Sequence, residues 1–437
     1  MAGQAAPAPA GMISRVSWRL LPIIGFSYLV AYVDRSNLSF ASVGMNADLG
    51  FSQTVYGIGA SVFFIGYALF EVPSNLLLDR FGARRWIARI MFSWGLISIG
   101  TLFVNAAWNF YLLRFLLGVA EAGFYPGVVH YLSHWLPANE RGRAVSRFYV
   151  FAPLGNMLMG LLATPILALD GAAGLAGWQW LLLLEGLPAL VMAGVVLIAL
   201  PEAPATAPWL SDAEKNWLSA RLAEDAVAGG GHQHRLGRAL IDPIVLTMGG
   251  AAACVFLTTN AISYSAPKLL MGAHHWSMAA AGGTIALGSL INIFAMLVVG
   301  SIADRARNPF AIMALLALMG GGGVLTVALG SGVGLAAPGY LLLWSGLQSA
   351  GMLPGIIVSR YVHPAARAGG LAMTNSIAQT GAFFGPLLFG IAADRSGSFT
   401  LGLELLVPVT LLAAALCLVG RWAQGRRGRH AALAPAI

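Results

Sequence analysis

Twelve apolar segments, each long enough to cross a lipid bilayer, are the feature that most restricts how this 437-residue chain can fold. A spanning helix needs about 20 consecutive apolar residues, because the hydrocarbon core is about 30 Å thick. Hydrocarbon offers no hydrogen-bond partners to the backbone, so each segment must satisfy its own amides as a helix. Only 10% of the residues are charged, against about 25% in soluble domains. The predicted spans are 20–40, 55–78, 86–104, 108–134, 144–168, 179–200, 243–267, 279–302, 310–330, 337–359, 368–392 and 400–421.

A polar stretch at residues 201–240 interrupts this series after the sixth span. Within it, Ser211 followed by Glu214 is a capping-box pattern, which predicts a short surface helix at about 211–224. The predicted fold class is therefore an all-α membrane protein with two six-helix bundles. No cleavable signal is expected, because the first residues lack an apolar region of their own. The predicted parts are a tail at 1–17, a bundle at 18–200, a linker at 201–240, a bundle at 241–422 and a tail at 423–437.

The distribution of basic residues predicts the orientation. Lysines and arginines gather in the cytoplasmic loops of membrane proteins. With both termini in the cytoplasm, all but four of the 25 basic residues lie on that side; the exceptions are Arg35, Arg114, Lys268 and Arg395. The net charge of +8 then faces the anionic lipid of the inner leaflet. Because the arginines are spread over separate short loops, nucleic-acid binding is not expected. The predicted location is a bacterial inner membrane.

The two halves resemble each other internally. Asp79 follows the second span and Asp304 follows the eighth, 225 positions later. Arg141 follows the fourth span and Arg367 follows the tenth, 226 positions later. Repeats of this size in a helical membrane protein are typical of transporters with two bundles, in which the substrate site lies between the halves near the middle of the membrane.

Four ionisable residues attract attention inside the spans: Asp34 and Arg35 in the first, and Arg114 and Glu121 in the fourth. Each costs at least about 2.5 to 3.5 kcal/mol in hydrocarbon, so each is a candidate for function. At 1.5 Å per residue, Arg35 lies roughly 22 Å from the cytoplasmic end of its span and Arg114 roughly 9 Å from the periplasmic end of its own. The two arginines are thus predicted at similar depths, with Asp34 stacked beside them. Glu121 is predicted on the face of Arg114 but roughly 10 Å deeper, beside the anion site rather than within it.

Two interpretations of these four residues stay open at this point. In the first, they form buried ion pairs that fix helix packing. In the second, the arginines bind a carboxylate substrate, which a guanidinium can grip with two hydrogen bonds. The bound anion would make the site net negative, and burial and like charge would then favour protonated carboxyl groups. Binding of the anion and of protons would thereby be coupled, as in a symporter.

Weaker candidates come from polar and aromatic residues in other parts of the spans. Tyr28 and Tyr32, one turn apart, line the site beside Arg35 or only pack. Polar residues in hydrocarbon bind substrate or join helices. Those considered for substrate contact are Asn375 and Gln379 in the eleventh span and Gln348 in the tenth.

Metal binding and disulfides are not expected. His130 and His134 have a spacing that could ligate zinc, but no carboxylate or cysteine is near them in sequence. His274 and His275 form a second histidine pair. Cys254 and Cys417 both fall in apolar spans and are interpreted as small core residues.

Four segments resemble the major facilitator superfamily and, within it, the anion:cation symporter family. They are YVDRSNLS at 32–39, FEVPSNLLLDRFGARRW at 70–86, RFLLGVAEAGFYPG at 114–127 and WLPANERGRA at 135–144. The first half is most similar to the branch that contains permeases for tartrate, phthalate and 4-hydroxyphenylacetate. The chain departs from the loop pattern of the superfamily at Asn75, where glycine is usual, and at Asn308.

The resemblance implies specific roles. Arg35 and Arg114 would bind the anion, and Asp34 and Glu121 would carry protons, which are the coupling ion and the only cofactor implied. The implied gating residues are Asp79, Arg80 and Arg84, with Asp304 and Arg305 at the corresponding place in the second half.

The sequence and the resemblance together predict a monomeric transporter that imports a small organic anion by proton symport. Anion exchange or proton-coupled efflux on the same fold is the alternative, because a fold does not determine direction. An enzyme or a channel is disfavoured, since no nucleophile or metal cluster occurs. Tyr32, Phe124 and Trp344 could stack on a ring, which favours an aromatic carboxylate over a sugar acid.

Overall fold

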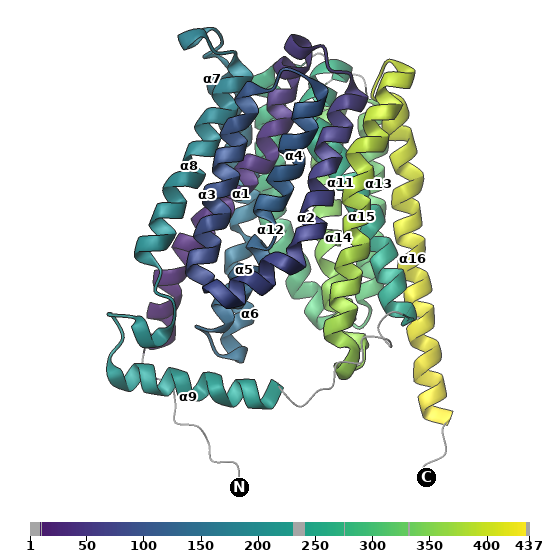
Figure 1. The fold of residues 1–437 in the computed structure, drawn as a ribbon. Helices are drawn as coiled ribbons and strands as arrows, with labels where there is room; N and C mark the ends of the chain where they lie inside the picture. The colour runs from purple at the N-terminus through teal and green to yellow at the C-terminus, as the bar shows by residue number, and fades with distance from the viewer. Residues whose placement is uncertain (1–8, 10, 230–240, 275, 331–332, 434–437) are drawn as a thin grey trace.

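The computed structural model describes residue 9 and residues 11–229, 241–274, 276–330 and 333–433. Within these ranges, twelve helical segments are long and apolar enough to cross a membrane. This confirms the predicted all-α class with twelve spans. Each predicted span overlaps one of the twelve (Figure 1).

The first six spans are α1 (Met12–Leu49), α2 (Gln53–Phe81), α3 (Ala83–Gly100) with η1 (Thr101–Phe103), α4 (Ala107–Glu121) with α5 (Phe124–Ser133), α6 (Ala138–Tyr149) with α7 (Phe151–Leu167), and α8 (Gly177–Ala199). The second six are α11 (Pro243–His274), α12 (Met278–Arg305), α13 (Pro309–Leu329), α14 (Val333–Tyr361), α15 (Pro364–Ser396) and α16 (Thr400–Leu433). The connections contain η2 (Ala172–Gly174), η3 (Pro204–Thr206) and α9 (Asp212–Gly229).

Several helices, α1 above all, are longer than the apolar segments that predict them. The first span is predicted at 20–40, whereas α1 runs from Met12 to Leu49. Its last turns contain Asn46 and Asp48, which are polar, and Gly50 ends the helix with a φ of 64°. Hydropathy marks only the stretch that lies in hydrocarbon, while backbone hydrogen bonding continues the helix into the interface.

The fourth span is interrupted directly after its carboxylate, Glu121. α4 ends at Glu121 and α5 begins at Phe124, with Gly123 between them at a φ of 86°. A Cβ on Gly123 would lie 2.5 Å from Oγ of Ser74, so both the backbone conformation and the space require glycine here. The break therefore places Glu121 at the end of a helix inside the membrane, as in transporters that form their sites from discontinuous helices.

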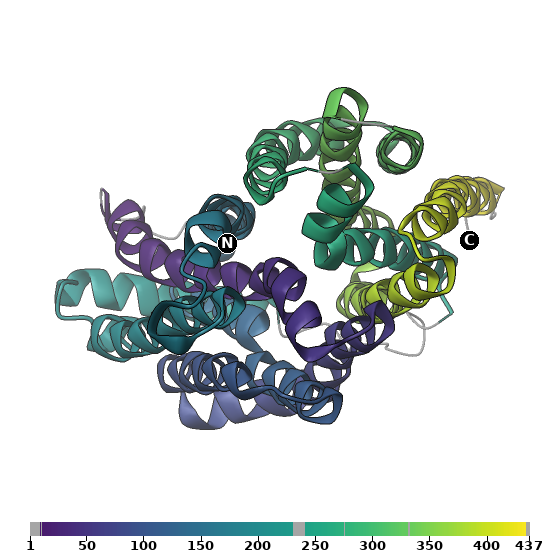
Figure 2. The same ribbon diagram turned by 90° about the horizontal axis from the view of Figure 1, so that it is seen from above.

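The two sets of six helices form two bundles that stand side by side (Figures 1 and 2). Across the boundary, α2 packs on α15, α7 on α12 and α1 on α11. Glycines allow the backbones to approach closely. A Cβ on Gly282 would lie 2.3 Å from the carbonyl oxygen of Gly160, and one on Gly57 would lie 2.5 Å from that of Pro386. Small residues at such contacts are typical of membrane helices, which associate through packing.

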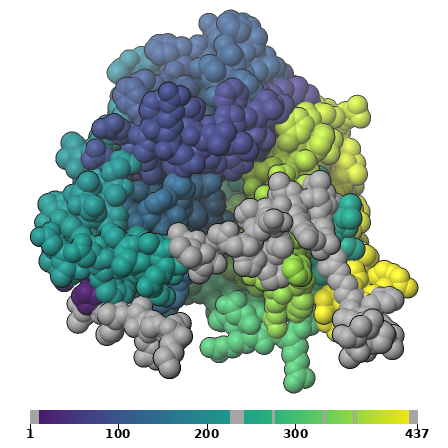
Figure 3. Space-filling model, turned by 60° about the horizontal axis from the view of Figure 1, so that its bottom comes forward, coloured from purple at the N-terminus to yellow at the C-terminus, as the bar shows by residue number. Residues whose placement is uncertain are grey.

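α1 begins and α16 ends on the side of the molecule where α9 lies across the helix ends (Figure 1). We call this side the terminal face and the opposite side the far face. Figure 3 looks at the terminal face, where both halves of the chain are visible. α9 begins with the capping box, in which Glu214 accepts from the amide of Ser211 at 2.9 Å. Arg15 of α1 lies 3.1 Å from Glu214, so the linker helix is tied to the first span.

Candidate functional site

An ion pair joins the first and fourth spans. Nε and Nη2 of Arg35 each lie 2.8 Å from Oε2 of Glu121. The Glu121 side chain is 1% exposed and that of Arg35 is 31% exposed. Oε1 of Glu121 has no hydrogen-bond partner. The prediction that Glu121 lies apart from the arginines is therefore wrong, because the long Arg35 side chain spans the difference in depth between the two backbones.

Arg114 is buried at 4% exposure and forms no ion pair with any described residue. Its Nε donates a hydrogen bond to the carbonyl oxygen of Gly59 at 3.3 Å. Its Nη2 donates to the hydroxyl of Tyr264 in the second half at 3.5 Å. These partners are neutral, so the positive charge stays uncompensated by contact. A buried charge without a partner is costly, and the site gains most from an anionic ligand.

The two guanidinium groups share an aromatic side chain. Cζ of Arg114 lies 4.9 Å from the centre of the Phe63 ring, and Cζ of Arg35 lies 5.6 Å from it. Cations are attracted to the faces of aromatic rings, so Phe63 holds both groups in place without neutralising them. Arg35 and Arg114, which were predicted at similar depths, thus reach the same ring.

Beside Arg35, five aromatic residues form what we call the aromatic wall: Tyr28, Tyr32, Tyr125, Phe148 and Tyr149. The ring of Tyr28 stacks on Phe148 at 4.3 Å and meets Tyr32 edge-on at 4.9 Å. Tyr125 meets Tyr149 edge-on at 6.1 Å. The wall reaches the ion pair through Tyr32, whose ring centre lies 5.6 Å from the arginine. It offers flat apolar faces and phenol hydroxyls next to a positive charge.

Asp34 has its hydrogen bond with α3 and not with an arginine. It is buried and accepts a hydrogen bond of 2.5 Å from Oγ of Ser98 on α3. Consecutive residues differ by about 100° around a helix, so Arg35 and Asp34 face different neighbours. Arg114 and Arg35 still act on the charge of Asp34, so its place beside the arginines stays a prediction.

The polar residues predicted in the second half do not reach the arginines. Asn375 is exposed, and Gln348 and Gln379 are partly exposed. The structure gives these three residues no hydrogen bond to Arg35 or Arg114. Instead, Tyr264 of α11 brings the second half to the site. A tyrosine in an apolar span carries no sequence signal that would have identified it.

A small enclosed cavity of about 10 Å³ lies between the halves. Trp344, whose Nε1 has no hydrogen-bond partner, lines it. The volume suits about one water molecule at most. Its polar wall consists of Ser36, Ser39, Asn156 and Ser263.

Hydrogen bonds between the halves gather toward the far face. Asp394 of α15 accepts from the backbone amides of Gln53 and Thr54 at 2.9 and 2.7 Å. Lys268 of α11 donates to the side chain of Gln53 at 3.2 Å. Tyr56 donates to the carbonyl oxygen of Tyr264 at 2.7 Å. A carboxylate at the first turn of a helix is stabilised by the unpaired amides there, so Asp394 holds the start of α2 against the second half.

The residues predicted to gate lie at the terminal face. Asp79 and Arg80 are exposed. Asp79 pairs with His130 at 3.2 Å, and Arg84 lies 3.6 Å from Glu202. The carboxylate that the histidine pair lacks in sequence is thus supplied by the fold. Among the described residues, no group of three metal-binding side chains occurs; His275 lies outside them.

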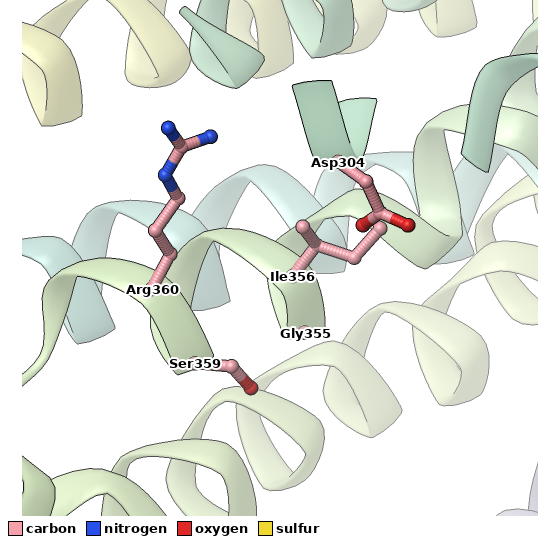
Figure 4. A pocket seen from close by; sticks show the side chains of 5 residues that line it. All are labelled: Asp304, Gly355, Ile356, Ser359 and Arg360. Atoms are coloured by element: carbon pink, nitrogen blue, oxygen red, sulfur yellow. The ribbon is translucent and has the colours of Figure 1, made fainter. Parts of the chain in front are cut away.

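The second-half candidates Asp304 and Arg305 are also exposed. Asp304 lines a cavity of about 390 Å³ together with Gly355, Ile356, Ser359 and Arg360. Figure 4 shows Asp304 and Arg360 on opposite sides of this cavity. Arg360 donates instead to the carbonyl oxygen of Ala306 at 2.8 Å.

A model of the Major Facilitator Superfamily matches residues 24–359, most of the chain. The chain belongs to this superfamily. The predicted family is thereby confirmed, and with it a multi-pass membrane transporter.

Relatives in bacteria match nearly the whole chain. A protein of Agrobacterium vitis named "Putative tartrate transporter" is 36% identical over 94% of this chain and 91% of its own length. A Pseudomonas putida protein named as the metabolite transport protein NicT is 37% identical over 89% of each chain. An Acinetobacter baumannii protein named as a quinolone resistance transporter is 36% identical over 92% of each chain.

Solved structures share the fold at low identity. The D-xylose-proton symporter matches with a TM-score of 0.71 and 18% identity, over 92% of this chain and 97% of that one. A bacterial homologue of the lysosomal transporter Spinster matches with a TM-score of 0.73 and 15% identity, over 96% of each chain. At these identities the likeness shows the fold alone.

Proposed function

We propose that this chain imports a small organic anion together with protons by alternating access. The observation that carries the proposal is Arg114, a buried guanidinium with no ion pair among the described residues. Near it, Arg35 is partly exposed and already pairs with Glu121. The tartrate transporters among the relatives support an organic anion as the substrate.

Coupling follows from the count of charges at this site. Arg35, Arg114 and Glu121 sum to one positive charge, so one carboxylate makes the site neutral. When that carboxylate engages Arg35, Glu121 loses the contact that stabilises its charge. A buried carboxylate that has lost its cation favours the protonated form. A proton on Glu121 would therefore accompany the anion, and Asp34 is proposed as a second proton carrier on the same helix as Arg35.

The proposed orientation puts the terminal face in the cytoplasm of a bacterial cell, with the chain in the inner membrane. The far face, held by Asp394 and Lys268, is then the closed periplasmic side. The predicted gating residues Asp79, Arg80, Arg84, Asp304 and Arg305 would form contacts between the two halves only when the terminal face closes.

The aromatic wall supports a carboxylate with an aromatic ring over a sugar acid. Tyr32 lies beside Arg35, so a ring could stack on the wall while its carboxylate meets the guanidinium. Asn375, Gln379 and Gln348 are proposed to contact substrate once the second half closes on it. A thermal-shift screen of the purified protein with tartrate, phthalate and 4-hydroxyphenylacetate tests the class, because a bound ligand raises the melting temperature.

Exchange or efflux is the second candidate, favoured by the relative named as a quinolone resistance transporter. Symport and anion exchange differ in whether protons move together with the anion. Symport predicts that adding substrate outside proteoliposomes makes the outer medium alkaline, whereas exchange of one anion for another leaves its pH unchanged. A pH-sensitive dye in the outer medium distinguishes the two.

Replacing Glu121 by Gln tests the coupling directly. The amide oxygen of Gln can still accept from Arg35, so the variant resembles the site with Glu121 protonated. It should therefore bind and exchange the anion found in the screen. Accumulation driven by a pH gradient should vanish, because no proton can be released inside. Radiolabelled uptake and exchange are compared in proteoliposomes, with Glu140→Gln on α6 as the control.

The packing interpretation predicts a different result. There, removing one partner of a buried pair costs about 3 to 5 kcal/mol, and the variant should fail to fold. Size-exclusion chromatography and thermal melting report this. A folded Glu121→Gln protein that still concentrates the anion against its gradient overturns the proton assignment.

A further inference from the structure

The small cavity between the halves has walls from both bundles. In the first bundle, α1 contributes Ser36 and Ser39 and α7 contributes Asn156. In the second, α11 contributes Ser263 and α14 contributes Trp344. None of the nine described residues that line the cavity is charged at neutral pH. A group enclosed here therefore meets hydrogen-bonding side chains and no charge.

The cavity contains a hydrogen-bond donor that the protein leaves unused. Trp344 is 4% exposed, and its Nε1 has no hydrogen-bond partner. Its ring stacks on that of Tyr340, with 6.0 Å between the ring centres and an interplanar angle of 9°, which holds the indole in place. A buried N–H group without a partner is unfavourable, so a ligand that accepts a hydrogen bond from it gains affinity.

Two serine hydroxyls supply hydrogen-bond acceptors. Oγ of Ser36 donates to the carbonyl oxygen of Tyr32 at 2.7 Å, and Oγ of Ser39 donates to that of Ser36 at 2.7 Å. A serine hydroxyl has one hydrogen and two lone pairs, so both oxygens can still accept. A ligand hydroxyl, which donates and accepts, matches a wall that offers both. A carboxylate only accepts, and it would bring an uncompensated charge into the cavity.

The volume of the cavity limits the size of the group that it can take. A cavity of about 10 Å³ holds about one water molecule at most. A single hydroxyl oxygen is of this size, whereas a carboxylate or an amide is larger. Size and hydrogen bonding therefore select the same group.

The cavity lies on the same face of α1 as the anion site. Tyr28, Tyr32, Ser36 and Ser39 follow one another at the spacing of one helix face, and Arg35 follows Tyr32 by three residues. Ser39 comes four residues after Arg35, which is roughly 6 Å farther along the helix axis. Along this face, the aromatic wall precedes Arg35 and the cavity follows it.

The second half connects the cavity to the other arginine. Ser263 of the cavity wall directly precedes Tyr264, whose hydroxyl accepts from Nη2 of Arg114 at 3.5 Å. A residue of the wall is thus adjacent in the chain to Arg35 in one half and to the partner of Arg114 in the other. A carboxylate bound between the arginines needs only a short arm to reach the cavity.

We propose that this cavity is a subsite for a hydroxyl group next to the carboxylate of the substrate, which is therefore an aromatic 2-hydroxy monocarboxylate. The carboxylate binds Arg35 and Arg114, and the ring lies on the aromatic wall. The hydroxyl enters the cavity, accepts from Nε1 of Trp344 and donates to a serine oxygen. This inference rests on the proposed function and deepens it by naming the substituent that the anion carries.

Three acids with the same skeleton test the proposal. Mandelate has a hydroxyl on the carbon beside the carboxylate, phenylacetate has only hydrogen there, and phenylmalonate has a second carboxylate. Their affinities for the purified full-length protein are measured by isothermal titration calorimetry. Mandelate should bind about 10-fold more tightly than phenylacetate, because it satisfies a buried donor. Phenylmalonate should bind more weakly than phenylacetate, because its second charge has no partner in the cavity.

Trp344→Phe removes the donor and keeps an aromatic ring. Mandelate should lose most of its advantage over phenylacetate in this variant. Ser36→Ala removes an acceptor whose own hydrogen bond stays within α1, and it should reduce the advantage as well. Trp94→Phe is the control, because Nε1 of Trp94 is also buried without a partner but Trp94 does not line the cavity. If Trp344→Phe fails to fold, Ser36→Ala decides. An advantage of mandelate that persists in every folded cavity variant overturns the proposal.

The parent protein separates this inference from the proposed function. If it binds none of these acids and none of those in the thermal-shift screen, the anion proposal fails, and the subsite fails with it. If phenylacetate binds as tightly as mandelate, or phenylmalonate binds more tightly, anion binding stands and only the hydroxyl subsite fails. The cavity would then hold no more than a structural water.

Discussion

At the scale of single residues, the two arginines differ in their partners more than in their positions. Arg35 has a carboxylate partner, whereas Arg114 has a carbonyl and a phenol. A guanidinium that bonds only neutral groups keeps its charge available for a ligand. Arg114 is therefore the residue on which anion binding depends most.

Arg114→Lys should reduce uptake of the anion by roughly 10- to 100-fold, because one charge-assisted hydrogen bond is worth about 1.5 to 3 kcal/mol. A lysine keeps the charge but cannot make the two-bond grip or reach both Gly59 and Tyr264. The initial rate of radiolabelled uptake measures the effect. Arg395→Lys, an exposed arginine at the far end of α15, serves as the control. Normal uptake in Arg114→Lys would remove this residue from the anion site.

At the scale of secondary structure elements, the start of α2 decides whether the far face is closed. Asp394 accepts from its first two amides, a contact between the two halves of the chain. A contact of the same kind lies within one half of the chain, where Asp170 accepts a hydrogen bond of 2.7 Å from the amide of Gly177 at the start of α8. These two aspartates are a natural pair for comparison.

Asp394→Asn should shift the equilibrium toward the state that is open at the far face, by up to about tenfold. The charge of a carboxylate at a helix start is worth about 0.3 to 1 kcal/mol, and the lost hydrogen bond adds to this. Distances between spin labels on the α7–α8 and α15–α16 connections report the opening. Asp170→Asn should leave these distances unchanged, because its contact lies within one half. If both substitutions change the spin-label distances equally, the contact of Asp394 with α2 does not hold the far face closed.

The linker helix α9 supplies a prediction about pH. Hydrogen bonding from the Ser211 backbone and the charge of Arg15 lower the pKa of Glu214. Since the folded-state pKa is depressed, this contact stabilises α9 above the ordinary pKa of glutamate and is lost as the pH falls through the lowered value. Amide hydrogen exchange in α9 should therefore accelerate in acid.

Glu214→Gln should show the faster exchange already at neutral pH. Glu224→Gln on the same helix removes a pairing with Arg221 that does not involve α1, so it should not loosen the attachment. If both variants exchange alike, α9 is not anchored through Glu214.

At the scale of the whole molecule, the interface between the two bundles contains places where the backbones of two helices are in direct contact. Gly282 of α12 lies against Gly160 of α7, and no side chain fits between them. The next residue, Gly283, has nothing within 4 Å of the place where a Cβ would be. A bundle interface that alternates between two packings depends on such close approach.

Gly282→Ala should abolish or strongly slow transport, because its methyl group would lie 2.3 Å from the oxygen of Gly160 and keep the halves apart. The helix itself should not suffer, since alanine is favoured over glycine in helices by about 1 kcal/mol. Turnover in proteoliposomes and the melting temperature are measured together. Gly283→Ala should transport normally. Normal turnover in Gly282→Ala would show that transport does not require this close contact between α12 and α7.

The sequence by itself determined the number of spans and the fold class, because hydrocarbon allows a spanning segment only one way to satisfy its backbone. It also identified Asp34, Arg35, Arg114 and Glu121, because charge inside a span is rare for energetic reasons. Glu185 carried the same signal, a single acid in an apolar span, and was overlooked.

Only the tertiary structure decided which of these charges meet. Depth along a helix does not specify direction around it or the reach of a side chain, so Glu121 pairs with Arg35 while Asp34 turns to Ser98. Asp79 met His130, and Asp394 met the start of α2, for the same reason. Such contacts depend on how neighbouring helices are rotated and packed, which is set by residues distant in the chain.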